Sequence, residues 1–439
     1  MILPTYTLPG RKTVSNSLIP KLFQTTKERV QQLIAEADAI CLTTDDWTSL
    51  NDVSYIALNA HFIDKDTALK YFLLGCTEFH ERHTAENVSN LFNETIHWGI
   101  ANKITEIITD NAANIVAAVH STTWRHFPCF AHTLNLTVQH SLDAINEQLD
   151  KVKAIVQYFK HSSSSCIRLT AIQKQMNLPI LELNQSVVTR WNSTYGMPDR
   201  LLKIKDAVVS ALAIEKPRLN NLTLYEWTLL EKCVEILKIF YEVTVDMSTE
   251  KSVSISKVMV LVKIMKTQVE RAISQSIENN TLATEAALLD PTHFYIRRNI
   301  ISGLNSIKKK LRSLFVDEEP PPIPQTSSQL TNVNVWAEFE KEIEKEMVRN
   351  PTAASIIEID KYLNEPLIKR TDDPLQWWNE SRLLYPNLYI LMKRRLCVPA
   401  TSVPCERVFS KAGQVINTKR SSLKPEKASQ VLFLQQNWT

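Results

Sequence analysis

The chain has 439 residues, 44% of them apolar, and a formal net charge of +3. A chain of this size can bury a sizeable core and is expected to form two or three folded units. Its seven cysteines form no C-x-x-C pair, which argues against a disulfide framework or a zinc finger and fits a reducing compartment. No segment approaches the ~18 apolar residues of a membrane span, and the N-terminus has no signal-peptide core. We therefore expect a soluble, intracellular protein with no membrane partner.

Positive charge is concentrated near the two ends of the chain. Residues 393–427 carry nine Lys or Arg against two Glu, and residues 1–30 carry five basic residues against one Glu. Local basic surfaces neutralise phosphates, so either segment could contact nucleic acid. The alternative for each segment taken alone is a solvated helix face.

Three strand-like segments open the first folded unit. The apolar and β-branched run Ala39–Thr44 predicts a short buried strand with Asp45 and Asp46 at its tip. Apolar residues alternate along Ser54–Ile63, and a second such run, Leu69–Phe79, follows a turn. Together these segments predict a three-stranded antiparallel meander.

A helix and a second acidic strand end come next. Thr84 is a candidate N-cap for this helix, and the following strand, Glu106–Thr109, ends at Asp110. In a right-handed crossover the fourth strand can lie beside the first, which would bring Asp45 and Asp110 together. This order of elements is typical of the opening of a ribonuclease-H-like fold.

The rest of the chain is predicted to be mainly helical. A short helix at 114–121, a possible strand at 127–130 and a long amphipathic helix at 134–159 precede helix after helix from about residue 162. An acidic, proline-rich segment at about 316–330 interrupts this block and has the composition of a solvated, disordered loop.

Five short motifs occur in order along the chain. They are Asp45-Asp46-Trp47-Thr48-Ser49, Thr109-Asp110-Asn111-Ala112-Ala113-Asn114, Cys129-Phe130-Ala131-His132, Arg190-Trp191-Asn192 and Ser402-Val403-Pro404-Cys405-Glu406-Arg407-Val408-Phe409-Ser410-Lys411-Ala412-Gly413. In order and approximate spacing they resemble the motifs of hAT-superfamily DNA transposases, most of all the branch whose members carry a BED zinc finger. The resemblance covers nearly the whole chain.

This resemblance implies an α/β (α+β) ribonuclease-H-like core interrupted by a large all-α insertion domain. We accordingly expect an N-terminal arm and helix at 1–38 and the first part of the core at 39–161. A helical insertion domain is expected at 162–375. The closing part of the core and the hAT C-terminal dimerisation region are expected at 376–439.

The family also implies a DDE site, in which two aspartates and one glutamate bind two Mg²⁺ (or Mn²⁺) ions for DNA strand cleavage and transfer. Matched to the motifs, these acids are Asp45, Asp110 and Glu406. Asp46 is an open question, because neighbouring side chains on a strand point to opposite faces and only one of the pair is expected to reach the metals. Taken singly, each acid would more commonly be a solvated turn residue or a helix cap.

His132 is implied to lie near the active site, where it would contact DNA or orient a catalytic carboxylate. Its spacing from Cys129 is compatible with zinc, but a structural zinc site needs about four ligands and no companion pair is present. No zinc is therefore predicted, and Cys129 is interpreted as a small buried residue.

Trp191 follows Arg190 and lies between polar neighbours. In related transposases the matching tryptophan stacks on a base displaced from the duplex, and such stacking contributes about 1–3 kcal/mol per base. The resemblance therefore favours a DNA-facing role for Arg190 and Trp191, with a structural tryptophan as the alternative.

Four basic residues lie beside or shortly after Glu406: Arg407, Lys411, Lys419 and Arg420. On a helix, Arg407 and Lys411 would share a face that could hold phosphates near the metals. The apolar residues of this region would either form the family's dimerisation surface or complete the core; they are Trp377, Trp378, Leu384, Leu388, Tyr389, Leu391, Met392 and Val431–Leu434.

The resemblance thus predicts a nuclear, dimerising, DNA-binding protein of the hAT transposase type, a candidate DDE transposase. Family members usually begin with a BED finger, which this sequence lacks, so we expect either a truncated gene model or a lost targeting module. The alternative is a domesticated or decayed, non-catalytic nuclear DNA-binding and dimerisation factor of the transcription-regulator type. A weaker alternative is a helical scaffold with no nucleic-acid role. At Cys405 the family commonly has serine.

Overall fold

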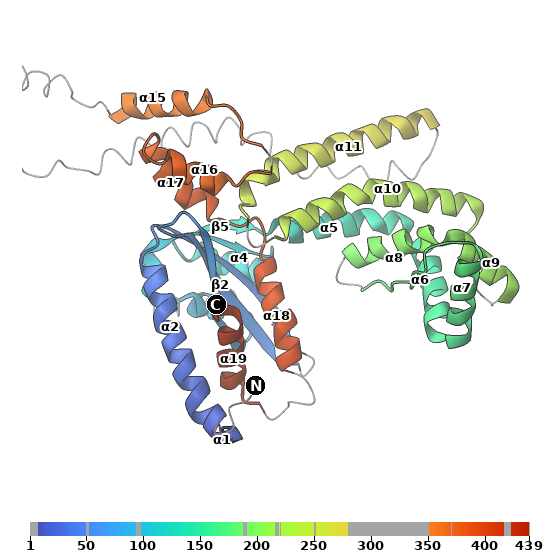
Figure 1. Ribbon diagram of the computed structural model, residues 1–439, viewed down its shortest axis with the longest axis horizontal. Helices are drawn as coiled ribbons and strands as arrows, with labels where there is room; N and C mark the ends of the chain where they lie inside the picture. Colours follow the sequence, from blue (N-terminus) through green and yellow to red (C-terminus); the bar gives the residue numbers. More distant parts are fainter. Residues whose placement is uncertain are drawn as a thin grey trace, which may run out of the picture.

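The computed structural model consists of a core built on a β-sheet and a lobe of helices beside it (Figure 1). The predicted loop at 316–330 lies outside the described residues. The structure describes residues 8–49, 52–93, 98–187, 191–215, 219, 221–249, 252–279, 351–369, 371–416 and 423–438.

The sheet has five strands in the order β3-β2-β1-β4-β5. Strands β1, β2 and β3 form an antiparallel meander, and β4 and β5 run parallel to β1. The predicted meander, and the predicted placement of the fourth strand beside the first, are confirmed. The bounds are β1 Ile40–Thr48, β2 Ser54–Ile63, β3 Leu69–Phe79, β4 Ile104–Thr109 and β5 Arg125–Pro128.

Helices cover both faces of the sheet, as expected for a ribonuclease-H-like α/β core. Helices α2, α3 and α4 pack on one face, α17 and α18 on the other, and α19 packs against β3 and α2. The N-terminal helix fills most of the predicted arm, since helical turns at Arg11–Thr13 and Val14–Leu18 run directly into α2. The bounds are α2 Ile19–Ala35, α3 Ala85–Asn93, α4 Ala113–His120, α17 Pro386–Leu396, α18 Val403–Val415 and α19 Pro425–Asn437.

The lobe is formed by helices that share one apolar cluster. The helix predicted at 134–159 is two helices, α5 and α6, because a 3₁₀ turn at Asp143–Ile145 separates them. Apolar side chains of both pack with the lobe. The bounds are α5 Phe130–Leu142, α6 Asn146–His161, α7 Ser163–Gln175, α8 Trp191–Lys203, α9 Lys205–Glu215, α10 Leu224–Met247 and α11 Val258–Asn279. Two further helices, α15 Pro351–Leu363 and α16 Pro374–Ser381, lie near α17 and outside the lobe.

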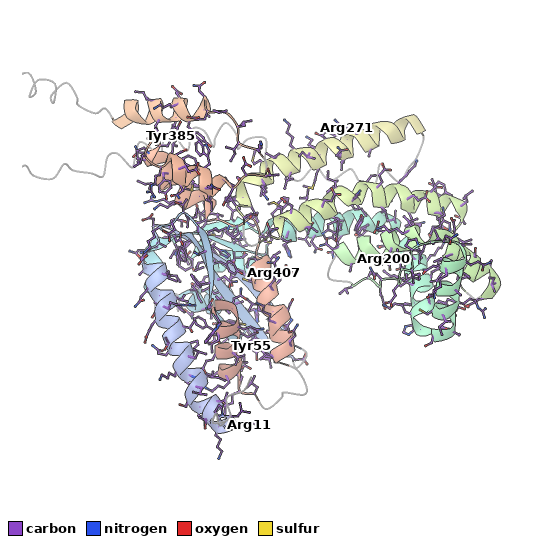
Figure 2. All side chains as sticks on the ribbon, viewed as in Figure 1. Arg11, Tyr55, Arg200, Arg271, Tyr385 and Arg407 are labelled. Carbon is purple, nitrogen blue, oxygen red and sulfur yellow. The ribbon has the colours of Figure 1, made fainter. Side chains whose placement is uncertain are left out.

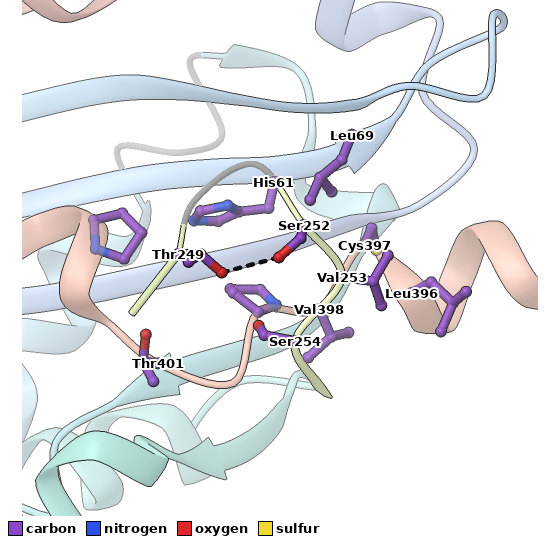
Figure 3. Close-up of a pocket in the computed structure, with 12 residues that line it drawn as sticks. His61, Leu69, Thr249, Ser252, Val253, Ser254, Leu396, Cys397, Val398 and Thr401 are labelled. Atoms are coloured by element: carbon purple, nitrogen blue, oxygen red, sulfur yellow. Dashed lines mark hydrogen bonds between the residues drawn. The ribbon is translucent and has the colours of Figure 1, made fainter. Parts of the chain in front are cut away.

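The joint between lobe and core contains a pocket of about 320 Å³ of empty volume, which includes open solvent (Figure 3). Residues 252–254, the segment 396–404 and His61 of β2 line it. Ala400 N donates a hydrogen bond to Ser254 Oγ at 2.9 Å. The segment that leads into α18 is therefore bound to the chain that leaves α10.

All seven cysteines are free, and five of them, Cys41, Cys76, Cys129, Cys397 and Cys405, are buried. Among the described residues, no helix combines the length and the apolarity needed to cross a bilayer.

Asn437 of α19 acts as a side-chain partner for the edge strand β3. Its Oδ1 accepts from Leu73 N at 3.0 Å, and its Nδ2 donates to Leu73 O at 2.8 Å. Both groups are buried, so Asn437→Ala should lower the free energy of unfolding by about 2–4 kcal/mol. Urea denaturation measures this loss, and the exposed Gln435→Ala on the same helix should change stability by less than about 0.5 kcal/mol. Equal effects of the two substitutions would contradict the assigned role.

Candidate metal centre

Strand β1 presents every second side chain to helix α18. Thr43 Oγ1 lies 3.5 Å from Cys405 Sγ, and the Trp47 ring stacks on Phe409 with 5.9 Å between centroids. Asp45 lies between Thr43 and Trp47 on the same face of the strand. Its carboxylate is therefore directed towards the first turn of α18.

Asp110 lies beside Asp45 because the two parallel strands end at different points. The pairing of β1 with β4 ends at Thr43, and β4 itself ends at Thr109. Strand β1 continues to Thr48 by pairing with β2, so the prediction that β1 ends before Asp45 is wrong. Relative to β4, however, Asp45 does lie past the strand end, next to Asp110.

Three aspartates form a compact carboxylate cluster. Oxygens of Asp45, Asp46 and Asp110 all lie within 4.8 Å of one another. Oxygens of both members of the adjacent pair thus reach the cluster, contrary to the prediction that only one would, and which of them would hold a metal stays a prediction. Asp46 also contacts a residue that the sequence did not indicate, because its Oδ2 lies 3.4 Å from Nδ1 of His83.

Glu406 flanks this cluster from the first turn of α18. Burial raises the pKa of Asp45 well above its usual range, and the charges of Glu406, Asp110 and Asp46 raise it further. Burial and Asp110 also raise the pKa of Asp46, while His83 opposes that shift. The structure thus brings Asp45, Asp110 and Asp46 together, and Glu406 lies near enough for its charge to act on Asp45.

The chain that enters α18 is fixed to the end of β5 by a buried thiol. Cys129 Sγ accepts hydrogen bonds from Ser402 N at 3.3 Å and from His132 N at 3.4 Å. Phe130 N donates to Ala400 O at 2.9 Å. His132 thus lies in the first turn of α5 next to this junction, and the role of its imidazole stays a prediction.

The DNA-facing prediction for Trp191 is wrong in this structure. Its side chain is 2% exposed and packs in the apolar cluster of the lobe, close to Tyr195. A buried ring has no free face for a nucleobase, so the structural alternative holds. The other predicted DNA contacts Arg190, Lys419 and Arg420 lie outside the described residues.

Arg407 and Lys411 have protein partners in different directions. Arg407 Nη2 donates to Ser248 O at 2.7 Å, which links α18 to the end of α10. Lys411 Nζ donates to Gln436 Oε1 at 2.8 Å, which links α18 to α19. These contacts do not form the shared phosphate-binding face that the spacing predicted, and DNA contact by either residue stays a prediction.

The donor set fits a hard divalent cation. Asp45, Asp46 and Asp110 offer only carboxylate oxygens, and the carboxylate of Glu406 on α18 acts electrostatically on Asp45. Oxygen ligands suit Mg²⁺ and Mn²⁺, whereas zinc sites are rich in nitrogen and sulfur. A bound cation would also offset the crowding of negative charge that raises the pKa of Asp45.

The sequence did not identify two residues that lie near the centre. Asn59 is fully buried on β2, and a polar amide in an otherwise apolar strand was an available signal. His83 lies in the connection after β3, where no motif marked it. Its contact with the Asp46 carboxylate joins residues that are distant in the sequence, so no local pattern indicates it.

Three protein-family models match consecutive parts of the chain. The ZBED1 RNase-like domain matches residues 43–126, and the ZBED1 RNase-like helical domain matches residues 127–236. The hAT family C-terminal dimerisation region matches residues 358–438. The chain belongs to the hAT family. Asp45, Asp110 and Glu406 all lie within these matched regions.

Relatives of this hAT-family chain include transposases and BED proteins. The putative AC transposase of Zea mays is 25% identical over 99% of this chain and 61% of the relative. The human zinc finger BED domain-containing protein 4 is 22% identical over 99% of this chain and 40% of the relative. The putative transcriptional regulator tpeD of Talaromyces stipitatus is 22% identical, over 97% and 56%. The chain thus spans about 40–61% of the length of these relatives.

Asp45→Asn should raise the free energy of unfolding at neutral pH in buffer without divalent ions, because a neutral amide avoids burial and repulsion of a charge. The pKa of Asp45 is raised on folding, so its charge costs stability above the usual aspartate range. As the pH falls through the raised pKa the folded state takes up the proton and the cost disappears. The gain should therefore shrink in acid.

Urea unfolding of both proteins across this pH range measures the effect. The exposed Asp66→Asn is the control and should change stability by less than about 0.5 kcal/mol. An Asp45→Asn protein that is no more stable than the unchanged chain at neutral pH would contradict the proposed crowding of charge.

Proposed function

We propose that this hAT-family chain is a transposase-like protein that binds DNA in the nucleus and cleaves and transfers DNA strands at a DDE centre. One observation supports the proposal most: Asp45 and Asp110 cluster near the ends of two parallel strands, and Glu406 of α18 lies near enough for its charge to act on Asp45. The strand-borne acids are Asp45 and Asp110, and Glu406 is the third.

In this proposal Asp45 and Asp110 hold Mg²⁺ or Mn²⁺ from the sheet, and Glu406 closes the site from α18. Asp46 is an additional ligand or a source of negative charge beside them. When bound, divalent ions would activate a water or a DNA 3′ hydroxyl and stabilise the leaving oxygen. The task of the protein is to hold these carboxylates in place, and α18 packs against the sheet through the apolar cluster that includes Val408 and Phe409.

A second candidate is a non-catalytic nuclear factor that retains DNA binding and self-association. It is supported by the relatives, which include a BED zinc finger protein and a putative transcriptional regulator as well as transposases. The same acids would then preserve a metal site without turnover.

Glu406→Gln tests the first candidate. We expect the unchanged chain to nick or join terminal-repeat DNA with Mn²⁺, and the variant to fall to the level without metal, because it loses one carboxylate charge at the centre. Glu426→Gln is a matched control, since Glu426 occupies the first turn of the neighbouring helix α19 and is exposed. Equal activity of the unchanged chain and Glu406→Gln would refute the site, and DNA binding without cleavage by either would favour the second candidate.

The dimerisation region contains both core and exposed apolar residues. Trp378, Leu388, Leu391 and Met392 are buried in the cluster under α17, so they complete the core, as the alternative interpretation held. Leu383 is 87% exposed. We propose that exposed side chains of this kind, rather than the buried ones, form the contact between two copies.

Leu383→Asp should therefore shift the protein towards monomer at concentrations where the unchanged chain is a dimer, as measured by sedimentation velocity. A charge placed in an apolar contact loses its hydration without gaining a partner. Ile167→Asp is the control, because Ile167 is 71% exposed on α7, outside the dimerisation region. An unchanged dimer in Leu383→Asp would exclude Leu383 from the interface.

A further inference from the structure

The position of Glu406 depends on how α18 is aligned along β1. The helix contacts the sheet through apolar side chains, among them Val408, Phe409 and Ala412. Apolar contact is non-directional, so it does not by itself fix a helix against sliding or turning. A shift of one residue would move the helix by about 1.5 Å and rotate its side chains by about 100°, enough to turn Glu406 away from Asp45.

One buried polar contact does fix this alignment. Cys405 is 0% exposed, and its Sγ accepts from Asn59 Nδ2 at 3.1 Å and donates to Thr43 O at 3.4 Å. Thr43 Oγ1 also lies 3.5 Å from the sulfur. These bonds join the residue just before Glu406 to a residue two positions before Asp45.

The Asn59 side chain makes its hydrogen bond to the Cys405 thiol. It is 0% exposed, and among the described residues its Oδ1 has no hydrogen-bond partner. A buried amide with an unsatisfied oxygen costs about 1–3 kcal/mol, which an apolar residue would avoid. Its Nδ2, by contrast, is bound to Cys405 Sγ. The amide therefore serves to orient the thiol rather than to stabilise the strand.

We infer that Cys405 and Asn59 are positioning residues that align α18 on β1 and so place Glu406 beside Asp45. Neither side chain is proposed to touch a metal or DNA. The inference rests on the proposed function, in that Glu406 is taken as the third acid of the centre. Tyr55 of β2, labelled in Figure 2, packs in the same apolar cluster as Val408 and Phe409 of α18.

The full chain offers a matched test. Cys405→Ala removes the thiol that Asn59 binds, and Cys405→Ser restores a group that donates and accepts. Cys76→Ala is the control, because Cys76 is 0% exposed in the same apolar cluster, on β3. The first readout is Mn²⁺ affinity by titration calorimetry, and the second is amide hydrogen exchange of residues 406–410 in metal-free protein.

We expect Cys405→Ala to weaken Mn²⁺ binding by about 10- to 100-fold, as substitutions that misorient metal ligands do. It should also speed exchange of residues 406–410. Cys405→Ser should stay within about 3-fold of the unchanged chain, and Cys76→Ala should leave both readouts unchanged even where it lowers stability.

Two outcomes separate this inference from the proposed function. If the unchanged chain binds no Mn²⁺ but Cys405→Ala alone speeds exchange of residues 406–410, the proposed function fails and the alignment role stands. If Cys405→Ala changes neither Mn²⁺ affinity nor amide exchange, the inference is overturned. It is also overturned if Cys76→Ala changes both readouts as much as Cys405→Ala does, whether or not the unchanged chain binds Mn²⁺.

Discussion

The structure depends on the docking of α18 against β1. Asp45 and Asp110 come from neighbouring strands, whereas Glu406 arrives almost three hundred residues later, after the chain has passed through the helical lobe. Its return is secured at successive points. Ala400 is hydrogen-bonded to Ser254 and to Phe130 at the start of α5. Cys405 of α18 is hydrogen-bonded to Asn59 of the sheet. These contacts hold the start of α18, and with it Glu406, against the sheet.

The acid cluster is a place where the needs of stability and of chemistry oppose each other. Carboxylates this close repel one another, and burial at Asp45 adds to the cost of charge. The surrounding core compensates, since Ile40, Leu42 and Ile107 are fully buried on the same two strands. In the proposed function, a bound divalent cation would offset this cost.

Much of the sheet was predictable, because its signals are local. Alternation along β2 and β3 and the acids after two apolar runs required only the geometry of strands and of one crossover. Asp46 was misjudged because strict alternation along β1 was expected to keep its carboxylate away from Asp45 and Asp110, yet oxygens of all three lie within 4.8 Å of one another. The DNA-facing role of Trp191 was taken from the family resemblance, whereas the start of α8 turns Trp191 and Tyr195, about one helical turn apart, into the lobe. The contacts of Cys405 join residues far apart in the chain, so no local pattern could reveal them.

The packing of α19 against β3 has a consequence for solubility. Strand β3 is eleven residues long and forms one edge of the sheet, and such an edge readily pairs with strands of other molecules. The side chain of Asn437 occupies the backbone groups of Leu73, and the helix before it packs along the strand. Removal of Asn437 would leave these backbone groups of β3 without a partner, and an exposed edge of this kind favours aggregation. Helix α19 therefore completes the fold and also covers this edge of the sheet.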